Sequence, residues 1–157
     1  MHDELKYNDD GTIAKVVPTH EGPKQLKPLD PYSVNRAVTI CQDKKVKVKM
    51  ADVRNASESV VIASEGGAWI RYAGFAFDAA PKSVAALCRA KGSAVIEVHK
   101  GAVDGPVAAS IQLSDTKGEF VRFSAAVSGI GTEKCDLYFV FGGSAAGVEF
   151  AQYRFGR

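Results

Sequence analysis

The stretch Lys45-Val46-Lys47-Val48-Lys49-Met50 alternates strictly between charged and apolar residues. A period of two places Val46, Val48 and Met50 on one face and the three lysines on the other, which is typical of a β-strand. A lysine-rich face is normally a solvated surface or an edge protected against association with another sheet. We therefore expect a strand here, with binding of an acidic polysaccharide as the alternative role of its lysines.

Similar short segments follow along the rest of the chain. From about Val34 onward, runs rich in Val, Ile, Phe and Tyr are separated by Gly, Ser, Asp and Asn, which is an all-β pattern. The expected further strands are 60–62, 69–77, 84–90, 95–99, 107–113, 120–127, 136–141 and 148–155. Only 84–88 comes close to a helical period, and Lys91-Gly92 would end such a helix soon afterwards. Many strands without helical crossovers predict a two-sheet antiparallel β-sandwich.

The composition excludes several classes of protein. The 157 residues suffice for one domain that buries an ordinary core. The chain has 20 Lys and Arg against 18 Asp and Glu, and this near balance argues against a nucleic-acid partner. No apolar stretch approaches the ~20 residues that span a bilayer, so no membrane partner is expected either.

The first 31 residues differ from the rest. They contain four of the six prolines, Pro18, Pro23, Pro28 and Pro31, which is typical of an extended tail or linker. We therefore divide the chain into a tail, 1–31, and a sandwich domain, 32–157. The polar start Met1-His2-Asp3-Glu4-Leu5-Lys6 is unlike a signal peptide. The chain is thus expected to be cytosolic or a piece of a longer secreted protein.

No catalytic motif stands out. The three histidines form no metalloprotease motif, and the chain has no G-x-S-x-G nucleophile motif. Four glutamates carry no signature that would select two of them as a glycosidase pair: Glu65, Glu97, Glu119 and Glu149. The three cysteines have no metal-ligand spacing. The residues by themselves favour a binding domain, not an enzyme.

Six segments, taken in order, resemble carbohydrate-binding module family 6 from about Tyr32 to the end of the chain. They are Gly67-Ala68-Trp69-Ile70-Arg71-Tyr72, Phe75-Ala76-Phe77-Asp78, Ile96-Glu97-Val98, Asp104-Gly105-Pro106-Val107-Ala108, Val127-Ser128-Gly129 and Asp136-Leu137-Tyr138-Phe139-Val140-Phe141. The resemblance implies a jelly-roll sandwich of the galactose-binding-like kind, which agrees with the strand pattern.

The tail is similar to the stretch that joins the catalytic propeller of glycoside hydrolase family 43 enzymes to such a module. The similar segments are 7–13, 16–19 and 29–32. The resemblance implies a parent hydrolase of the xylosidase or arabinofuranosidase type that acts on arabinoxylan-like polymers. It further implies an N-terminal catalytic domain in the same chain, and a secreted, cell-surface or periplasmic location.

The family's main sugar site lies in loops at one end of the sandwich, between two aromatic rings and beside an asparagine. The resemblance places Phe120 at one ring and Glu149 at the asparagine, whereas the second ring falls near Ala63. Phe120 is then expected to stack on a pyranose, and Glu149 and Glu65 to accept hydrogen bonds from its hydroxyl groups. Trp69 matches a buried core position of the family.

The family also holds a structural calcium ion, for which the resemblance places unsuitable residues here. Arg36 and Val38 fall at the glutamate positions and Ala151 at the aspartate position. Calcium needs several oxygen ligands with net negative charge, so we expect no calcium and no other cofactor. Arg36 is expected to pair with a carboxylate such as Glu149 or Glu119.

Two hypotheses on function follow. The leading one is a non-catalytic module that binds a polysaccharide or oligosaccharide of the xylan type for an attached hydrolase, with a degraded end site. The alternative is an accessory sandwich that has lost sugar binding and packs on, or stabilises, the catalytic domain. Sugar binding on the concave face of the sandwich is a third option.

Overall fold

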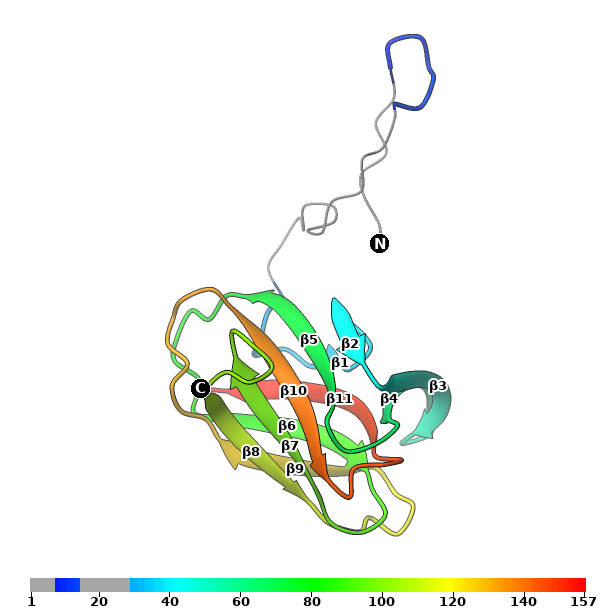
Figure 1. Cartoon of the computed structure of the whole chain (residues 1–157), viewed down its shortest axis with the longest axis vertical. Coiled ribbons are helices and arrows are strands. Elements are labelled where there is room, and N and C mark those ends of the chain that lie inside the picture. The colour runs from blue at the N-terminus through cyan, green and yellow to red at the C-terminus, as the bar shows by residue number, and fades with distance from the viewer. Residues whose placement is uncertain (1–7, 15–28) are drawn as a thin grey trace.

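A computed structural model describes residues 8–14 and 29–157 (Figure 1). Eleven strands account for the regular structure of these residues, which contain no helix and therefore none that could cross a membrane. The strands are β1 (Asn35–Arg36), β2 (Gln42–Lys44), β3 (Val46–Val53), β4 (Ala56–Ala63), β5 (Ala68–Phe75), β6 (Ser83–Arg89), β7 (Ala94–Lys100), β8 (Val107–Leu113), β9 (Val121–Ala126), β10 (Cys135–Gly143) and β11 (Glu149–Gly156). Most of the predicted tail, 1–31, lies outside the described residues.

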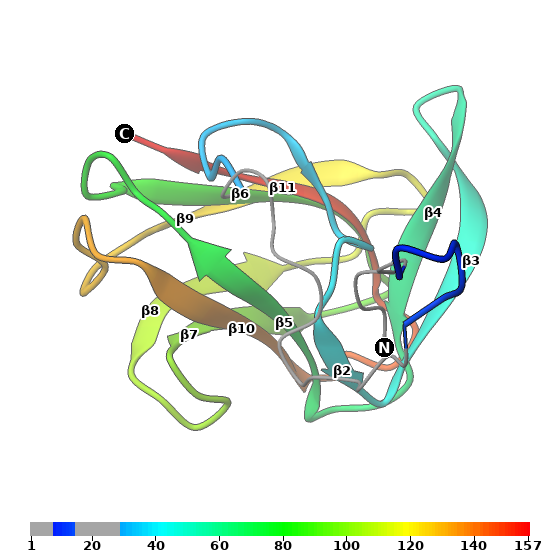
Figure 2. The same ribbon diagram turned by 90° about the horizontal axis from the view of Figure 1, so that it is seen from above.

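The strands form two antiparallel sheets. Sheet I has the order β3-β4-β11-β6-β9, with β1 also paired to β11, and sheet II has the order β2-β5-β10-β7-β8. Figure 2 shows the two layers, with β6, β9 and β11 in one and β5, β7, β8 and β10 in the other. The predicted all-β, two-sheet sandwich is confirmed.

The segment before β3 does not form one continuous strand. Only Asn35 and Arg36 form β1, and the backbone then turns, with the Thr39 amide donating to the Arg36 carbonyl at 3.2 Å. The chain next enters sheet II as β2, which pairs with β5. The segment cannot be one strand because it crosses from sheet I to sheet II.

The alternating stretch forms β3, as predicted, but its apolar face is not covered. Val48 is 53% exposed and Met50 is 60% exposed, because β3 is the edge strand of sheet I and the neighbouring edge strand of sheet II, β2, has only three residues. On the opposite face, Lys49 reaches the carboxylate of Glu149.

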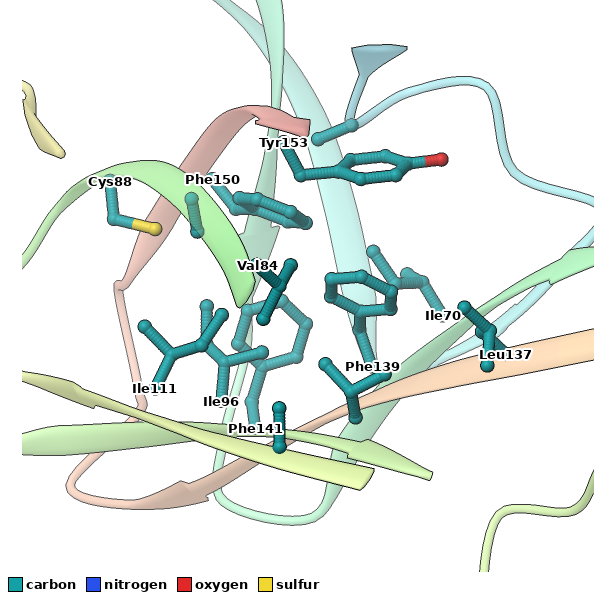
Figure 3. Close-up of a cluster of buried hydrophobic side chains, with 14 of the residues drawn as sticks. Ile70, Val84, Cys88, Ile96, Ile111, Leu137, Phe139, Phe141, Phe150 and Tyr153 are labelled. Atoms are coloured by element: carbon teal, nitrogen blue, oxygen red, sulfur yellow. The ribbon is translucent and has the colours of Figure 1, made fainter. Parts of the chain in front are cut away.

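Aromatic side chains from both sheets fill the space between them (Figure 3). Phe139 and Phe141 from β10 meet Phe150 and Tyr153 from β11, and all four are almost completely buried. The ring centroids of Phe139 and Phe150 are 5.8 Å apart, and those of Phe139 and Tyr153 are 5.1 Å apart. Aromatic pairs at such distances stabilise a core by about 0.5–1.5 kcal/mol beyond the burial of their area.

Two tyrosines in this core differ in the hydrogen bonding of their hydroxyl groups. The ring centroids of Tyr72 and Tyr153 are 4.7 Å apart, and both residues are 1% exposed. Tyr72 donates to the backbone carbonyl of Ala37 at 2.7 Å. Tyr153 Oη is buried without a hydrogen-bond partner among the described residues. Burial raises the pKa of both phenols, so both stay neutral.

The same substitution should therefore have opposite effects at these two positions. Tyr72→Phe should lower the free energy of unfolding by about 1–2 kcal/mol, because it leaves the Ala37 carbonyl without its donor. Tyr153→Phe should leave it unchanged or raise it slightly, because it removes a buried polar group that has no partner. Urea unfolding of the two variants and the unsubstituted chain measures both changes. Equal losses of stability would contradict this account of the core.

Candidate functional site

Strand pairing brings the three predicted site residues to the same end of the sandwich. Glu149 begins β11, where it lies opposite Ile62 of β4 and Arg89 of β6. Phe120 directly precedes β9, whose first residue pairs with β6, and Glu65 follows β4. What these side chains can bind depends on their neighbours.

The carboxylate of Glu149 is fully engaged by cations. Lys49 Nζ donates to its Oε1 at 2.8 Å, and Arg89 donates to its Oε2 from Nε at 3.1 Å and from Nη2 at 2.5 Å. Burial raises the pKa of Glu149, but the hydrogen bonds from Lys49 and Arg89 more than offset this effect and hold the pKa below its usual value. Glu149 is thus an ionised anchor for two cations and has little capacity left for sugar hydroxyls.

Phe120 lies beneath the same arginine. The guanidinium of Arg89 is 4.6 Å from the centroid of the Phe120 ring, a cation–π contact. Phe120 is only 7% exposed and belongs to a second apolar cluster, on the outer face of sheet I, with Val60, Leu87 and Ala151. The ring face that would stack on a pyranose is therefore covered in this structure.

Glu65 is separate from this network. Its exposed carboxylate pairs with Lys45, the residue before β3. A pocket of about 300 Å³ adjoins the network and is lined by Arg89, Ala90, Lys91, Gly118, Gly147 and Glu149. The structure thus joins Phe120 to Glu149 through Arg89 and leaves Glu65 apart from both.

The positions of the family's calcium ligands show no metal cage. Among residues 8–14 and 29–157, no group of three His, Cys, Asp or Glu side chains could hold a metal ion. Ala151 is fully buried in the second apolar cluster. The expected pairing of Arg36 with Glu149 or Glu119 is wrong. Lys49 and Arg89 occupy the Glu149 carboxylate, and no carboxylate oxygen in the described part of the chain lies within 4.0 Å of the Arg36 guanidinium.

A different surface, on the outer face of sheet II, presents an aromatic pair. Trp69 of β5 and Tyr138 of β10 have ring centroids 5.6 Å apart and rings tilted by 58°. Both side chains are partly exposed. The expectation that Trp69 is a core residue is wrong, since its neighbours Ala68 and Ile70 point inward and Trp69 must point outward.

One polar pair beside the aromatic rings comes from β5 and β10. Tyr138 lies opposite Arg71, whose Nη2 and Nε donate to Asp136 Oδ2 at 2.6 and 3.1 Å. The hydrogen bond to Asp136 raises the pKa of Arg71, although burial opposes it. Arg71 Nη1 also donates to Gln42 Oε1 at 2.9 Å. The guanidinium is therefore held in a fixed orientation next to Tyr138.

A second polar pair lies on the other side of Tyr138. His99 of β7 is opposite Tyr138, and its Nε2 is 3.2 Å from Glu97 Oε2. Its Nδ1 is 3.0 Å from the carbonyl oxygen of Gly105, which ties the ring to the β7–β8 loop. The outer face of sheet II thus combines a partly exposed aromatic pair with oriented donors and acceptors on both sides.

The sequence contained one signal for this surface. Trp69 and Arg71 are two residues apart in one strand and therefore share a face, and a charged side chain at Arg71 marks that face as outward. The sequence contained no comparable indication for Tyr138, because the position of its strand between β5 and β7 follows only from the order of strands in sheet II. Likewise, nothing in the sequence linked Arg89 or Lys49 to Glu149.

The Glu149 network should make stability depend on pH. The lowered pKa means that its stabilising effect is complete above the pKa of the unfolded chain, about 4.3, and is lost as the pH falls through the folded-state pKa. Glu149→Gln should lower the free energy of unfolding at pH 7 by about 1–3 kcal/mol, because two cations lose their partner. The difference from the unsubstituted chain should shrink in urea titrations below pH 4.

The control for this prediction is Glu65→Gln. It breaks an ion pair whose two side chains are 48% and 54% exposed, so the free energy of unfolding should change by less than about 0.5 kcal/mol. If Glu149→Gln lowers the free energy of unfolding by the same amount at low pH as at pH 7, the charge of the Glu149 carboxylate does not account for its stabilising effect.

Comparison with protein families places the chain in one of them. The model of the family "Carbohydrate binding module (family 6)" matches residues 36–157, which is nearly the whole sandwich. A comparison with curated proteins gives no match.

Solved structures give the same fold. A glycoside hydrolase family 43 arabinoxylan arabinofuranohydrolase from Bacillus subtilis, in complex with cellotetraose, matches with a TM-score of 0.87 at 25% identity; the match covers 99% of this chain and 34% of the hydrolase. A β-1,3-glucan-binding family 6 module from Bacillus halodurans has a TM-score of 0.77 at 19% identity, covering 83% of this chain and all of that one. A family 6 module from Clostridium stercorarium, in complex with cellobiose, has a TM-score of 0.74 at 18% identity, covering 85% and 99%.

This chain spans about a third of the length of the arabinofuranohydrolase, whereas it covers the two isolated modules almost completely. The strand order, the core and the family match over residues 36–157 lead to one conclusion. The chain belongs to family 6 of the carbohydrate-binding modules, which are non-catalytic.

Proposed function

We propose that this module binds polysaccharide through the outer face of sheet II, with Trp69 and Tyr138 as the sugar platform. The observation that carries the proposal is the partly exposed aromatic pair, whose ring centroids are 5.6 Å apart, with polar groups on both sides. This surface combines aromatic faces with oriented hydrogen-bonding groups.

The chemistry of sugars suits this surface. The C–H face of a pyranose is apolar and packs on an aromatic ring, while its hydroxyl groups need donors and acceptors. Glu97 offers a carboxylate oxygen, and Arg71 offers N–H groups held in place by Asp136 and Gln42. Since Arg71 and His99 already have protein partners, their side chains lose little conformational freedom when a sugar binds.

We further propose a neutral plant polysaccharide of the xylan or arabinoxylan type as the ligand. The arabinoxylan arabinofuranohydrolase that this module resembles supports this choice. The same likeness supports a parent glycoside hydrolase of family 43 that is secreted or held at the cell surface, with a catalytic domain ahead of residue 32. The module would then hold this catalytic domain against its polymeric substrate.

The end site formed by Phe120, Glu149 and Glu65 is the less favoured position for the sugar. Stacking on Phe120 would require Arg89 to leave both the ring and the Glu149 carboxylate. Charge-assisted hydrogen bonds of this kind are costly to break. We therefore infer that the end site is degraded and that the outer face of sheet II replaces it.

Substitution of one aromatic residue on the outer face of sheet II and one at the end site tests which of the two surfaces binds the sugar. Trp69→Ala should weaken binding of soluble arabinoxylan about tenfold or more, because an aromatic anchor contributes a large share of binding energy. Phe120→Ala should leave binding unchanged, because its ring is covered by Arg89. Affinity electrophoresis measures both, and near-UV circular dichroism checks that each variant is folded.

Tyr138→Phe serves as the matched control. It keeps the ring beside Trp69 and should therefore retain most of the affinity, whereas Tyr138→Ala should not. The outer-face proposal fails if Phe120→Ala abolishes binding while Trp69→Ala binds normally.

A second candidate function, an accessory sandwich that packs on the catalytic domain, is favoured by the uncovered face of β3. Val48 and Met50 expose apolar side chains to solvent on one face of an edge strand, where a neighbouring domain could cover them. The match to the hydrolase covers 99% of this chain, against 83% and 85% for the isolated modules.

Deletion of residues 32–157 from the parent hydrolase separates the two functions. An accessory role predicts that deletion lowers the melting temperature and the activity on small soluble substrates, and that Val48→Lys with Met50→Lys has the same effect. A pure binding role predicts reduced activity only on the polymer. Unchanged melting temperature in both variants would exclude the accessory role.

A further inference from the structure

The outer face of sheet I, on the opposite side of the sandwich from Trp69 and Tyr138, has an excess of positive charge. Its cations are Arg36 of β1, Lys47 and Lys49 of β3, Arg89 of β6, Arg122 of β9 and Arg154 of β11, which alternate with core residues along their strands. Only two carboxylates of these strands share the face, Glu58 and Glu149. The net charge of the whole chain is +2, so the positive charge is concentrated here.

Both carboxylates already have partners within the protein. Glu149 binds Lys49 and Arg89, and Glu58 accepts hydrogen bonds from Gln152 Nε2 at 3.1 and 2.9 Å. By contrast, no carboxylate oxygen within the described ranges lies within 4.0 Å of three exposed arginines: Arg36, Arg122 and Arg154. These three guanidinium groups are available to an external anion.

The register of sheet I spaces these arginines in a regular way. Arg122 lies opposite Leu87, Leu87 opposite Gln152, and Gln152 opposite Arg36, so that one row crosses four strands. Neighbouring strands are about 4.8 Å apart, which puts the Cα atoms at the ends of this row ~14 Å apart. Arg154 lies between them, two residues further along β11. Such spacing suits an extended polymer with repeated charges.

A shallow groove lies between Arg122 and Arg154. Its lining includes Val34, Ala85, Leu87, Arg122, Gln152 and Arg154. The floor is apolar at Ala85 and Leu87, while the sides carry two guanidinium groups and an amide. A carboxylate substituent of a sugar that lies across this groove can receive a paired hydrogen bond from an arginine.

We propose that the outer face of sheet I is a second glycan-binding surface, selective for polysaccharides whose sugars carry carboxylate groups. The inference rests on the carbohydrate-binding function of the module but uses a different face and a different class of ligand from the Trp69–Tyr138 surface. The module would thereby bind neutral and acidic parts of a polymer on opposite sides of the sandwich.

Two probes and three variants test this surface in the full 157-residue chain. Polygalacturonate should retard the chain in affinity electrophoresis at low ionic strength, and Arg122→Gln and Arg154→Gln should each weaken this binding roughly two- to fivefold. Sodium chloride at about 0.5 M should abolish polygalacturonate binding, because at this ionic strength the attraction between exposed charges extends over only a few ångströms. Lys134→Gln, which removes one exposed positive charge from the β9–β10 loop, should bind polygalacturonate normally.

Arabinoxylan is the second probe, and it separates failure of this inference from failure of the proposed function. Its binding should depend on Trp69 and not on Arg122 or Arg154, while polygalacturonate binding should show the reverse pattern. The second surface is refuted if polygalacturonate does not bind, or if Lys134→Gln weakens its binding as much as Arg122→Gln does. If the unsubstituted chain binds polygalacturonate but does not bind arabinoxylan, only the sheet II proposal is refuted.

Discussion

Packing of aromatic rings between β10 and β11 fixes how the two sheets face each other, and the exposed surfaces depend on it. These strands follow each other in the chain but belong to different sheets, and Phe139 meets Phe150 and Tyr153 across the core. Because side chains alternate along a strand, an inward Phe139 forces Tyr138 outward, and an inward Phe150 forces Glu149 outward. The core thus determines which polar and aromatic groups each outer face presents.

Because of this constraint, the two outer faces present different kinds of side chain. Sheet II carries the Trp69–Tyr138 pair beside polar groups that are oriented by other protein groups. Sheet I carries arginines and lysines around a small apolar cluster that includes Phe120. At the end of the sandwich, Arg89 joins Phe120 to Glu149 and covers the ring. An aromatic residue at a family position is therefore insufficient evidence for a sugar site until its neighbours are known.

Several features were predictable because they depend on local pattern alone. The alternation over 45–50 predicted β3, and the spaced apolar runs predicted most of the remaining strands. The short β1 and β2 were missed, because the crossing between sheets at 37–41 depends on which sheet each strand joins. Trp69 was placed in the core because the resemblance matched it to a buried core position of the family, although Arg71 on the same face of the strand is charged. The exposure of Val48 and Met50 was missed because it depends on the length of an edge strand in the other sheet.

The sequence by itself determined the all-β class and the family, because these follow from short-range periodicity and from the order of segments along the chain. Only the tertiary structure decided which side chains share a surface. Glu149 and Lys49 are a hundred residues apart and Arg36 and Arg122 are 86 residues apart, and sheet order alone brings the members of each pair to the same face. Ionic and aromatic contacts act over a few ångströms, so a site made of such contacts exists only after strand pairing has set the register.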